Sequence, residues 1–137
     1  MKLSRFAGAL VAVVLVTSSL FAAEDLTGKW SGTFVATMNG GSPDNDAAHM
    51  VLKQTGTELT GTAGPSLDRQ MPIQKGTILV AKIGGKDTTK VSFDVPLAEG
   101  PVLHFDLELI DGHLKGKANA EQDGIKLTAV VDVTRVK

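Results

Sequence analysis

From Lys29 to the C-terminus, apolar and polar residues alternate with a period of two. Successive side chains of a β-strand point to opposite faces, so this pattern predicts strands with one buried and one exposed face. No stretch of this region shows the 3.6-residue period of an amphipathic helix. We therefore expect an all-β fold.

Eight strands are expected, or nine if Gly76 bends or breaks one of them. They cover residues 29–38, 49–55, 58–63, 72–83, 89–95, 102–110, 113–120 and 125–135. Residues 39–46 are rich in Gly, Asn and Asp and predict an exposed loop. The only Trp, Trp30, opens the first strand in a Gly-x-Trp sequence. Short strands after such a start favour a small up-and-down antiparallel β-barrel of about eight strands.

Two Asp-Gly pairs, Asp111-Gly112 and Asp123-Gly124, predict two-residue type I′ turns between strands. Turns of this length fix which residues lie opposite each other. On the inner face, large residues then meet small ones: Phe105/Ala118, Leu107/Gly116 and Leu103/Ala120. On the outer face, opposite charges meet at Asp106/Lys117, Glu108/Lys115, Lys115/Asp132 and Glu121/Lys126. Agreement on both faces supports this register, because a slip of one residue would exchange them.

A weak internal repeat extends the same arrangement to residues 50–63. With Gly56-Thr57 as a turn, Leu52 faces Gly61 and Met50 faces Ala63. Small residues opposite large ones suit a narrow barrel, whose interior has no room for a full row of leucines.

Residues 1–23 have the features of a secretion signal. Lys2 and Arg5 precede an apolar run, and Ala22-Ala23 offers small residues for cleavage. The alternative is that this segment anchors the chain in a membrane. We expect removal of 1–23, export to the periplasm or the medium, and a single domain at 24–137. The chain contains no Cys, so its stability cannot depend on disulfides.

The charge of the mature chain disfavours some partners. Loss of Lys2 and Arg5 from the 14 basic residues leaves 12 against 15 acidic ones, a net charge of about −3. Nucleic-acid binding requires a basic face, so we expect no nucleic-acid partner. We also expect no stable membrane span in the mature chain.

No residue pattern indicates a catalytic, cofactor or metal site. The three histidines, His49, His104 and His113, are expected to be solvated surface residues that do not converge on a metal. The Asp44-Asn45-Asp46 sequence resembles the start of a calcium loop but lacks the later ligands, and predicts a mobile acidic loop. No Gly-x-Ser-x-Gly sequence is present. Four acidic residues receive no predicted role: Glu58, Asp68, Asp94 and Glu99.

The segments Leu26-Thr27-Gly28-Lys29-Trp30 and Leu59-Thr60-Gly61-Thr62 resemble the opening strands of avidin-type and lipocalin-like (calycin) barrels. The chain is also similar to small exported bacterial barrels, which are mostly uncharacterised. In lipocalins a Gly-x-Trp and a late Arg pack together at the closed end. The resemblance therefore implies barrel closure by Gly28, Trp30 and Arg135. It implies no biotin binding, because avidins use several tryptophans and a tyrosine that this mature chain lacks.

The position of Trp30 and Arg135 leads to the same expectation without the resemblance. One begins the first strand and the other ends the last, so pairing of these strands would make them neighbours. We expect the guanidinium to contact the indole ring.

The expected function is the binding of a small apolar or amphipathic molecule by a non-enzymatic exported barrel. The alternative is a packed accessory module that docks another envelope protein or a polymer, and a hydrolase is a third class. A connected apolar pocket of about 300 Å³ or more favours ligand binding, whereas a filled core favours the docking module.

Overall fold

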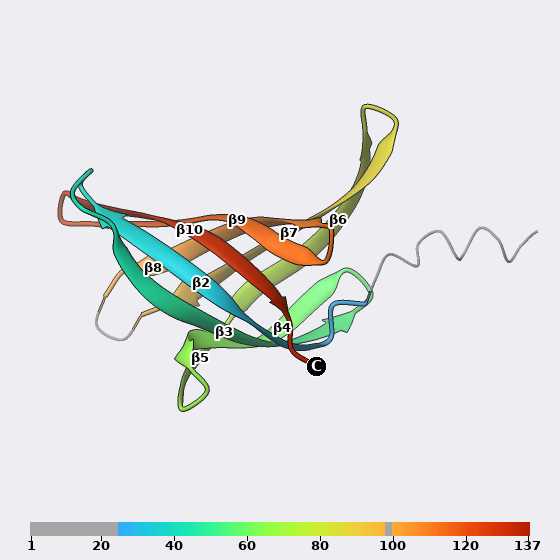
Figure 1. Ribbon diagram of the computed structural model, residues 1–137, viewed down its shortest axis with the longest axis horizontal. Coiled ribbons are helices and arrows are strands. Elements are labelled where there is room, and N and C mark those ends of the chain that lie inside the picture. Colours follow the sequence, from blue (N-terminus) through green and yellow to red (C-terminus); the bar gives the residue numbers. More distant parts are fainter. Residues whose placement is uncertain (1–24, 98–99) are drawn as a thin grey trace, which may run out of the picture.

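The computed structural model describes residues 25–97 and 100–137, which form nine β-strands and no helix (Figure 1). The strands are β2 (Gly28–Met38), β3 (Asp44–Thr55), β4 (Glu58–Ser66), β5 (Arg69–Pro72), β6 (Gln74–Ile83), β7 (Lys86–Pro96), β8 (Val102–Ile110), β9 (His113–Gln122) and β10 (Ile125–Arg135). The secretion signal expected at residues 1–23 lies outside the described residues.

The strands close into an eight-stranded antiparallel barrel, as expected. Their order in the sheet is β3-β2-β10-β9-β8-β7-β6-β4-β5, and β3 also pairs with β4, which closes the ring. The β4 strand pairs with β6 only at Glu58 and Leu59. Further along the same edge it pairs with the short β5. Strands that follow one another in the chain are therefore neighbours almost everywhere, which is the definition of a meander.

Two strand boundaries differ from the expectation. Residues 44–46 are not a loop, since they extend β3 and pair with residues 34–36 of β2. The segment expected at 72–83 is divided at Ile73, whose N–H donates a 3.0 Å hydrogen bond to the Gly61 carbonyl. The predicted bend at Gly76 is present as a register shift between Gln74 and Thr77.

The register predicted from the Asp-Gly turns is confirmed. Phe105 lies opposite Ala118 and Leu107 lies opposite Gly116. The β8–β9 ladder ends at His104, so the pair predicted between Leu103 and Ala120 falls just beyond it. The remaining predicted partners also agree, including Leu52/Gly61, Met50/Ala63, Lys115/Asp132 and Glu121/Lys126.

Gly116 shows why small residues are needed opposite large ones. A Cβ atom at this position would lie 2.1 Å from the Asp106 carbonyl oxygen and 2.8 Å from the Leu107 Cα atom. The β8 and β9 backbones therefore approach each other so closely at Gly116 that no residue with a side chain would fit at this position. Such close crossing is the expected consequence of closing a sheet into a narrow barrel.

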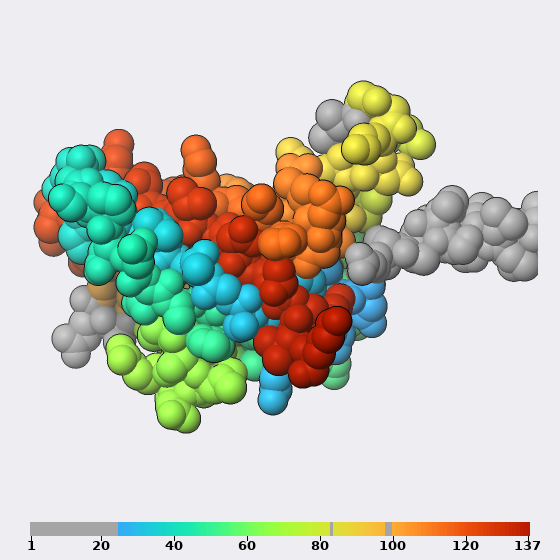
Figure 2. Space-filling model, in the orientation of Figure 1, coloured from blue at the N-terminus to red at the C-terminus, as the bar shows by residue number. Residues whose placement is uncertain are grey.

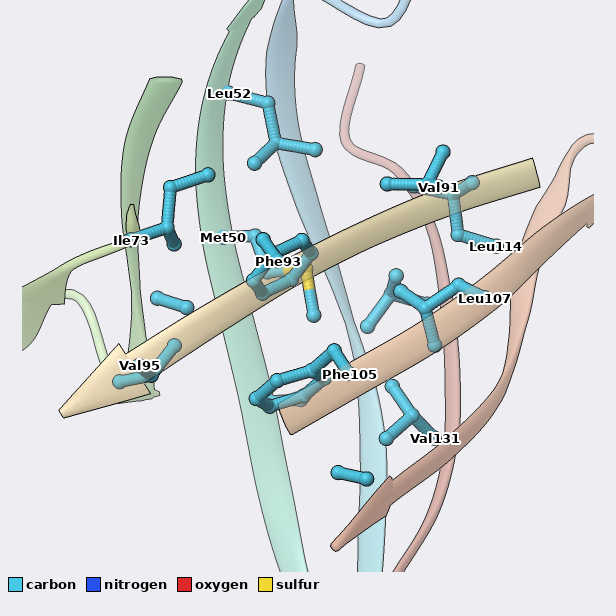
Figure 3. Packing of buried hydrophobic residues seen from close by; sticks show 14 of the residues in the cluster. Met50, Leu52, Ile73, Val91, Phe93, Val95, Phe105, Leu107, Leu114 and Val131 are labelled. Carbon is cyan, nitrogen blue, oxygen red and sulfur yellow. The ribbon is translucent and has the colours of Figure 1, made fainter. Parts of the chain in front are cut away.

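The barrel interior is filled by side chains. Phe93 of β7 and Phe105 of β8 point inward (Figure 3) and stack with their ring centroids 4.7 Å apart. Phe93 is fully buried, and Leu114 and Val131 are likewise fully buried around it. The interior thus leaves no central channel, and any binding site has to lie at an end of the barrel or on its surface.

The hairpins extend beyond the barrel body. The β6–β7 hairpin (yellow) stands out from it in Figure 2, at the opposite side of the view from the turn between β2 and β3. Because strands run antiparallel, the turns alternate between two ends of the barrel. One end carries Trp30 and Arg135, and the other carries the 39–43 and 123–124 turns.

Candidate functional site

One end of the barrel is sealed by residues 25–27. Leu26 is fully buried and belongs to the core cluster. Its N–H donates to Oε1 of Gln54 at 2.9 Å, and its carbonyl accepts a 3.0 Å hydrogen bond from the indole Nε1 of Trp30. Every polar group that Leu26 carries into the core is therefore satisfied, which is required of buried backbone.

Arg135 holds the same segment from the other side. It lies opposite Trp30 in the β10–β2 ladder, with the guanidinium carbon 4.6 Å from the centroid of the indole ring. Nη1 donates to the Thr27 carbonyl and Nη2 to the Asp25 carbonyl, both at 2.8 Å. Gly28 leaves room for this arrangement, since a Cβ atom there would lie 3.2 Å from Nη1. The three residues thus meet at one end, and their role in holding the barrel closed remains a prediction.

The Asp25 carboxylate orders the start of this segment. It accepts a 3.0 Å hydrogen bond from the Thr27 N–H. Hydrogen bonds from the Thr27 side chain and N–H lower the pKa of Asp25 below its ordinary value of 3.8. The segment therefore carries a charged carboxylate at neutral pH.

The opposite end of the barrel is open and contains an apolar cavity of about 210 Å³. Its walls come from both sides of the barrel, and its inner limit is Phe105. The apolar lining includes Phe34, Met50, Met71, Val95, Leu103 and Phe105. A cavity of about 150 Å³ with similar walls stays dry and admits benzene, so this cavity has room for one group of about that size.

Two exposed apolar side chains continue the cavity wall outward, and we call them the apolar shelf. Met38 lies on the inner face of β2 and Ile125 on the inner face of β10, where 58% and 49% of their surfaces are exposed. Leu127, which lines the cavity, pairs with Met38 and lies two residues from Ile125 on the same face of β10. The shelf therefore adjoins the cavity wall at Leu127.

Asp46 is the only carboxylate among the described residues that line the cavity. It occupies the inner face of β3, opposite Phe34 of β2. Its Oδ1 accepts a 2.8 Å hydrogen bond from the Ala47 N–H. The mobile acidic loop expected at Asp44-Asn45-Asp46 is therefore wrong, because β2 pairing holds these residues as strand. Among the described residues, no three His, Cys, Asp or Glu side chains are placed to hold a metal ion.

His104 is not a simple solvated histidine. Its Nδ1 lies 2.6 Å from Asp94 Oδ1, directly across the β7–β8 ladder, and its Nε2 lies 3.2 Å from Asp106 Oδ2. The hydrogen bond with Asp94 raises the pKa of His104 above its ordinary value of 6.5, and the charge of Asp106 adds to this. The Asp106 carboxylate therefore contacts His104 on the same strand. Lys117 lies opposite Asp106 in the ladder as predicted, but within the described residues the two side chains form no ion pair within 4.0 Å.

This arrangement favours a charged imidazolium over a general base. Ser92 lies opposite Asp106 on the same outer face. A Ser–His–Asp relay needs one ring nitrogen free to accept the serine proton. Both nitrogens of His104 face carboxylates instead, so the ring is placed to bridge two strands rather than to activate Ser92.

A second histidine also has a carboxylate partner. Nδ1 of His113 lies 2.7 Å from Asp132 Oδ1, although the ladder places Lys115 opposite Asp132. His49 lines the cavity, and its carbonyl accepts a 3.1 Å hydrogen bond from Gln70. The three histidines lie apart, as expected.

Sequence reasoning missed most of the cavity. Residues 64–71, some of which form part of its wall, are assigned to no strand by the sequence pattern, and no signal marks Met71 as inward. The Gly, Asn and Asp content of residues 39–46 predicts a loop at Asp46, whereas the structure places Asp46 in β3. One signal does indicate that β2 and β3 extend toward the open end. The alternation of β2 continues through the apolar residues Ala36 and Met38.

Within residues 25–97 and 100–137, no helix has the length and apolar character needed to cross a membrane. Comparison of this chain with models of known protein families, with curated proteins and with solved structures found no match.

Proposed function

We propose that this protein is an exported, non-enzymatic barrel that binds a small apolar or amphipathic molecule at its open end. The observation that carries the proposal is the apolar cavity of about 210 Å³, continued outward by the shelf of Met38 and Ile125. Exposed apolar surface joined to a cavity is typical of a binding site. Residues 25–27 cover the other end, where a second hollow, lined by residues that include Asp25, Gln54 and Thr57, is more polar.

The size of the cavity limits the ligand. Pockets that enclose a whole drug-sized molecule measure about 300–1,000 Å³, and this cavity is smaller. The cavity therefore takes one ring or a short alkyl group, and the rest of a larger molecule lies over the shelf. A lipocalin-like or avidin-like relationship, proposed from Gly28, Trp30 and Arg135, agrees with binding at an open end.

The cavity of about 210 Å³ is smaller than the ~300 Å³ expected of a ligand-binding barrel, and together with the filled interior this supports the alternative function, a packed module that docks another envelope protein or a polymer. Phe93 and Phe105 occupy the space in which larger barrels hold a ligand. In that case the cavity and shelf would receive a side chain of the partner. The two functions differ in whether a free small molecule binds.

A titration with benzyl alcohol, followed by amide resonances in ¹H–¹⁵N spectra, tests the proposal. We expect saturable shifts of residues around the cavity, including Ala48 and Leu103. The variant Ala48→Leu fills the cavity and should abolish these shifts, because Ala48 is 5% exposed and lines it. The control Thr128→Leu introduces the same residue on the outer face and should leave binding unchanged. Absence of saturable shifts in the wild-type protein would favour the docking module.

A further inference from the structure

The cavity wall carries a single carboxylate. Among the described residues that line it, Asp46 is the only acidic one and none is Lys or Arg. Its carboxylate belongs to the inner face of β3, two residues before the buried Ala48. Apart from Asp46 and His49, the described lining residues are apolar or Gly, so the Asp46 carboxylate is the one acidic group beside the apolar surface that a ligand would contact.

This carboxylate is available to a ligand. Within the described part of the chain, no Lys, Arg or His nitrogen lies within 4.0 Å of the Asp46 carboxylate oxygens, and its one side-chain hydrogen bond is to the adjacent Ala47 N–H. A carboxylate can accept several hydrogen bonds, so capacity remains. Asp44, the next inward residue toward the rim, is exposed and likewise has no cationic nitrogen within 4.0 Å in this part of the chain.

A fixed carboxylate beside apolar surface selects ligands by charge. An ammonium group gains Coulomb attraction and charge-assisted hydrogen bonds from it. An anion is repelled, and a neutral hydroxyl gains only an ordinary hydrogen bond. The attraction acts over short range at physiological salt, so the cation has to lie next to the apolar group that fills the cavity.

We propose that the site binds small amphiphilic ammonium compounds, with one ring or short alkyl group in the cavity and the cationic group at Asp46. This inference rests on the proposed function, since it names the chemical class of ligand for the same cavity. The ring lies against Phe105 and Met50, and the ammonium group lies at the rim beside Phe34 and Asp46.

Three compounds with the same ring test the inference: benzylammonium, benzyl alcohol and benzoate. Their dissociation constants are measured by the same amide titration at neutral pH and low salt. We expect benzylammonium to bind about two- to fivefold more tightly than benzyl alcohol, the range for an exposed ion pair. Benzoate should bind more weakly than the alcohol. Added salt should reduce the advantage of benzylammonium without changing the binding of the alcohol.

Two variants with the same change in net charge identify the residue responsible. Asp46→Asn should remove the preference for benzylammonium and leave the affinity for benzyl alcohol unchanged. Asp123→Asn, in the turn at the same end of the barrel, should retain the preference because Asp123 does not line the cavity. Its left-handed conformation (φ 51°) is one that Asn adopts readily, so the control should fold normally.

The outcomes separate this inference from the proposed function. Saturable binding of benzyl alcohol with no advantage for benzylammonium would overturn the charge selection and leave the proposed function intact. A preference that survives in Asp46→Asn would overturn the assignment to Asp46. Failure of all three compounds to bind would overturn both proposals.

Discussion

Replacement of Arg135 by Ala tests how the sealed end is held. The change removes two hydrogen bonds from the guanidinium to the Thr27 and Asp25 carbonyls, each 2.8 Å long. Net contributions of such bonds at an exposed site are about 1 kcal/mol each. The contact with Trp30, at 4.6 Å, contributes about 0.5–1 kcal/mol at an exposed site. We therefore expect Arg135→Ala to lower the free energy of unfolding by about 2–3 kcal/mol.

Urea unfolding followed by fluorescence measures this loss, because Trp30 is the only Trp of the chain. The native emission maximum should also shift, since the cation beside the indole is gone. Lys126→Ala is the matched control: it removes a single exposed cation from the same strand and should cost less than about 0.5 kcal/mol. The loss of unfolding free energy for Arg135→Lys should lie between these two values. The lysine ammonium group keeps the positive charge but lacks the planar, forked guanidinium that donates to both carbonyls.

Equal losses for Arg135→Ala and Lys126→Ala would show that the contacts at the sealed end contribute nothing to stability. A double-mutant cycle with Trp30→Phe, in which all four proteins are unfolded in urea and followed by circular dichroism because the Phe variants have no Trp, separates the ring contact from the hydrogen bonds. A coupling energy close to zero would mean that the stabilisation by Arg135 comes entirely from its hydrogen bonds to the Thr27 and Asp25 carbonyls.

Three further predictions follow from the register, from the outer-face carboxylates and from the N-terminal sequence. Phe105→Ala should cost about 2–5 kcal/mol and Lys117→Ala well under 1 kcal/mol in urea melts, and similar losses would mean that the inner and outer faces are misassigned. His104 has a raised pKa when folded, so its contribution to stability is complete below pH 6.5 and declines as the pH rises through the folded value. Asp94→Asn should flatten that decline, measured as the difference in urea midpoint between pH 5.5 and 8.5; an unchanged slope would contradict it. The intact mass of exported protein should correspond to a chain lacking about 22 or 23 residues, and a full-length membrane-bound chain would refute export.

The part of the fold that the sequence predicted is the part with local determinants. Two-residue Asp-Gly turns fix the register of the strands they join, so Phe105/Ala118 and Leu107/Gly116 could be paired from the chain alone. The loop between β7 and β8 is longer and fixes no register. The contact between Asp94 and His104 depends on that register, so the sequence could not predict that these two residues pair.

The β4–β5 hairpin depends on contacts that are distant in sequence. Gln70 donates hydrogen bonds to the carbonyls of Ser66 and His49 and accepts one from the Thr62 hydroxyl. These bonds hold a strand of only four residues whose own pattern is too short to show alternation. The cavity wall formed by this hairpin was therefore invisible to periodicity.

Asp44 and Asp46 break the rule that the rest of the barrel obeys. The inner face of β3 is apolar at Ala48, Met50 and Leu52, and both acids lie on that face at its open end. Stability alone would favour apolar residues there, because strand interiors disfavour Asp. In natural proteins, residues that break the hydrophobic pattern of their strand occur mainly at functional sites. Asp46 lines the apolar cavity and Asp44 lies next to it on the same face, and this coincidence makes charge selection at the open end the most economical reason for them.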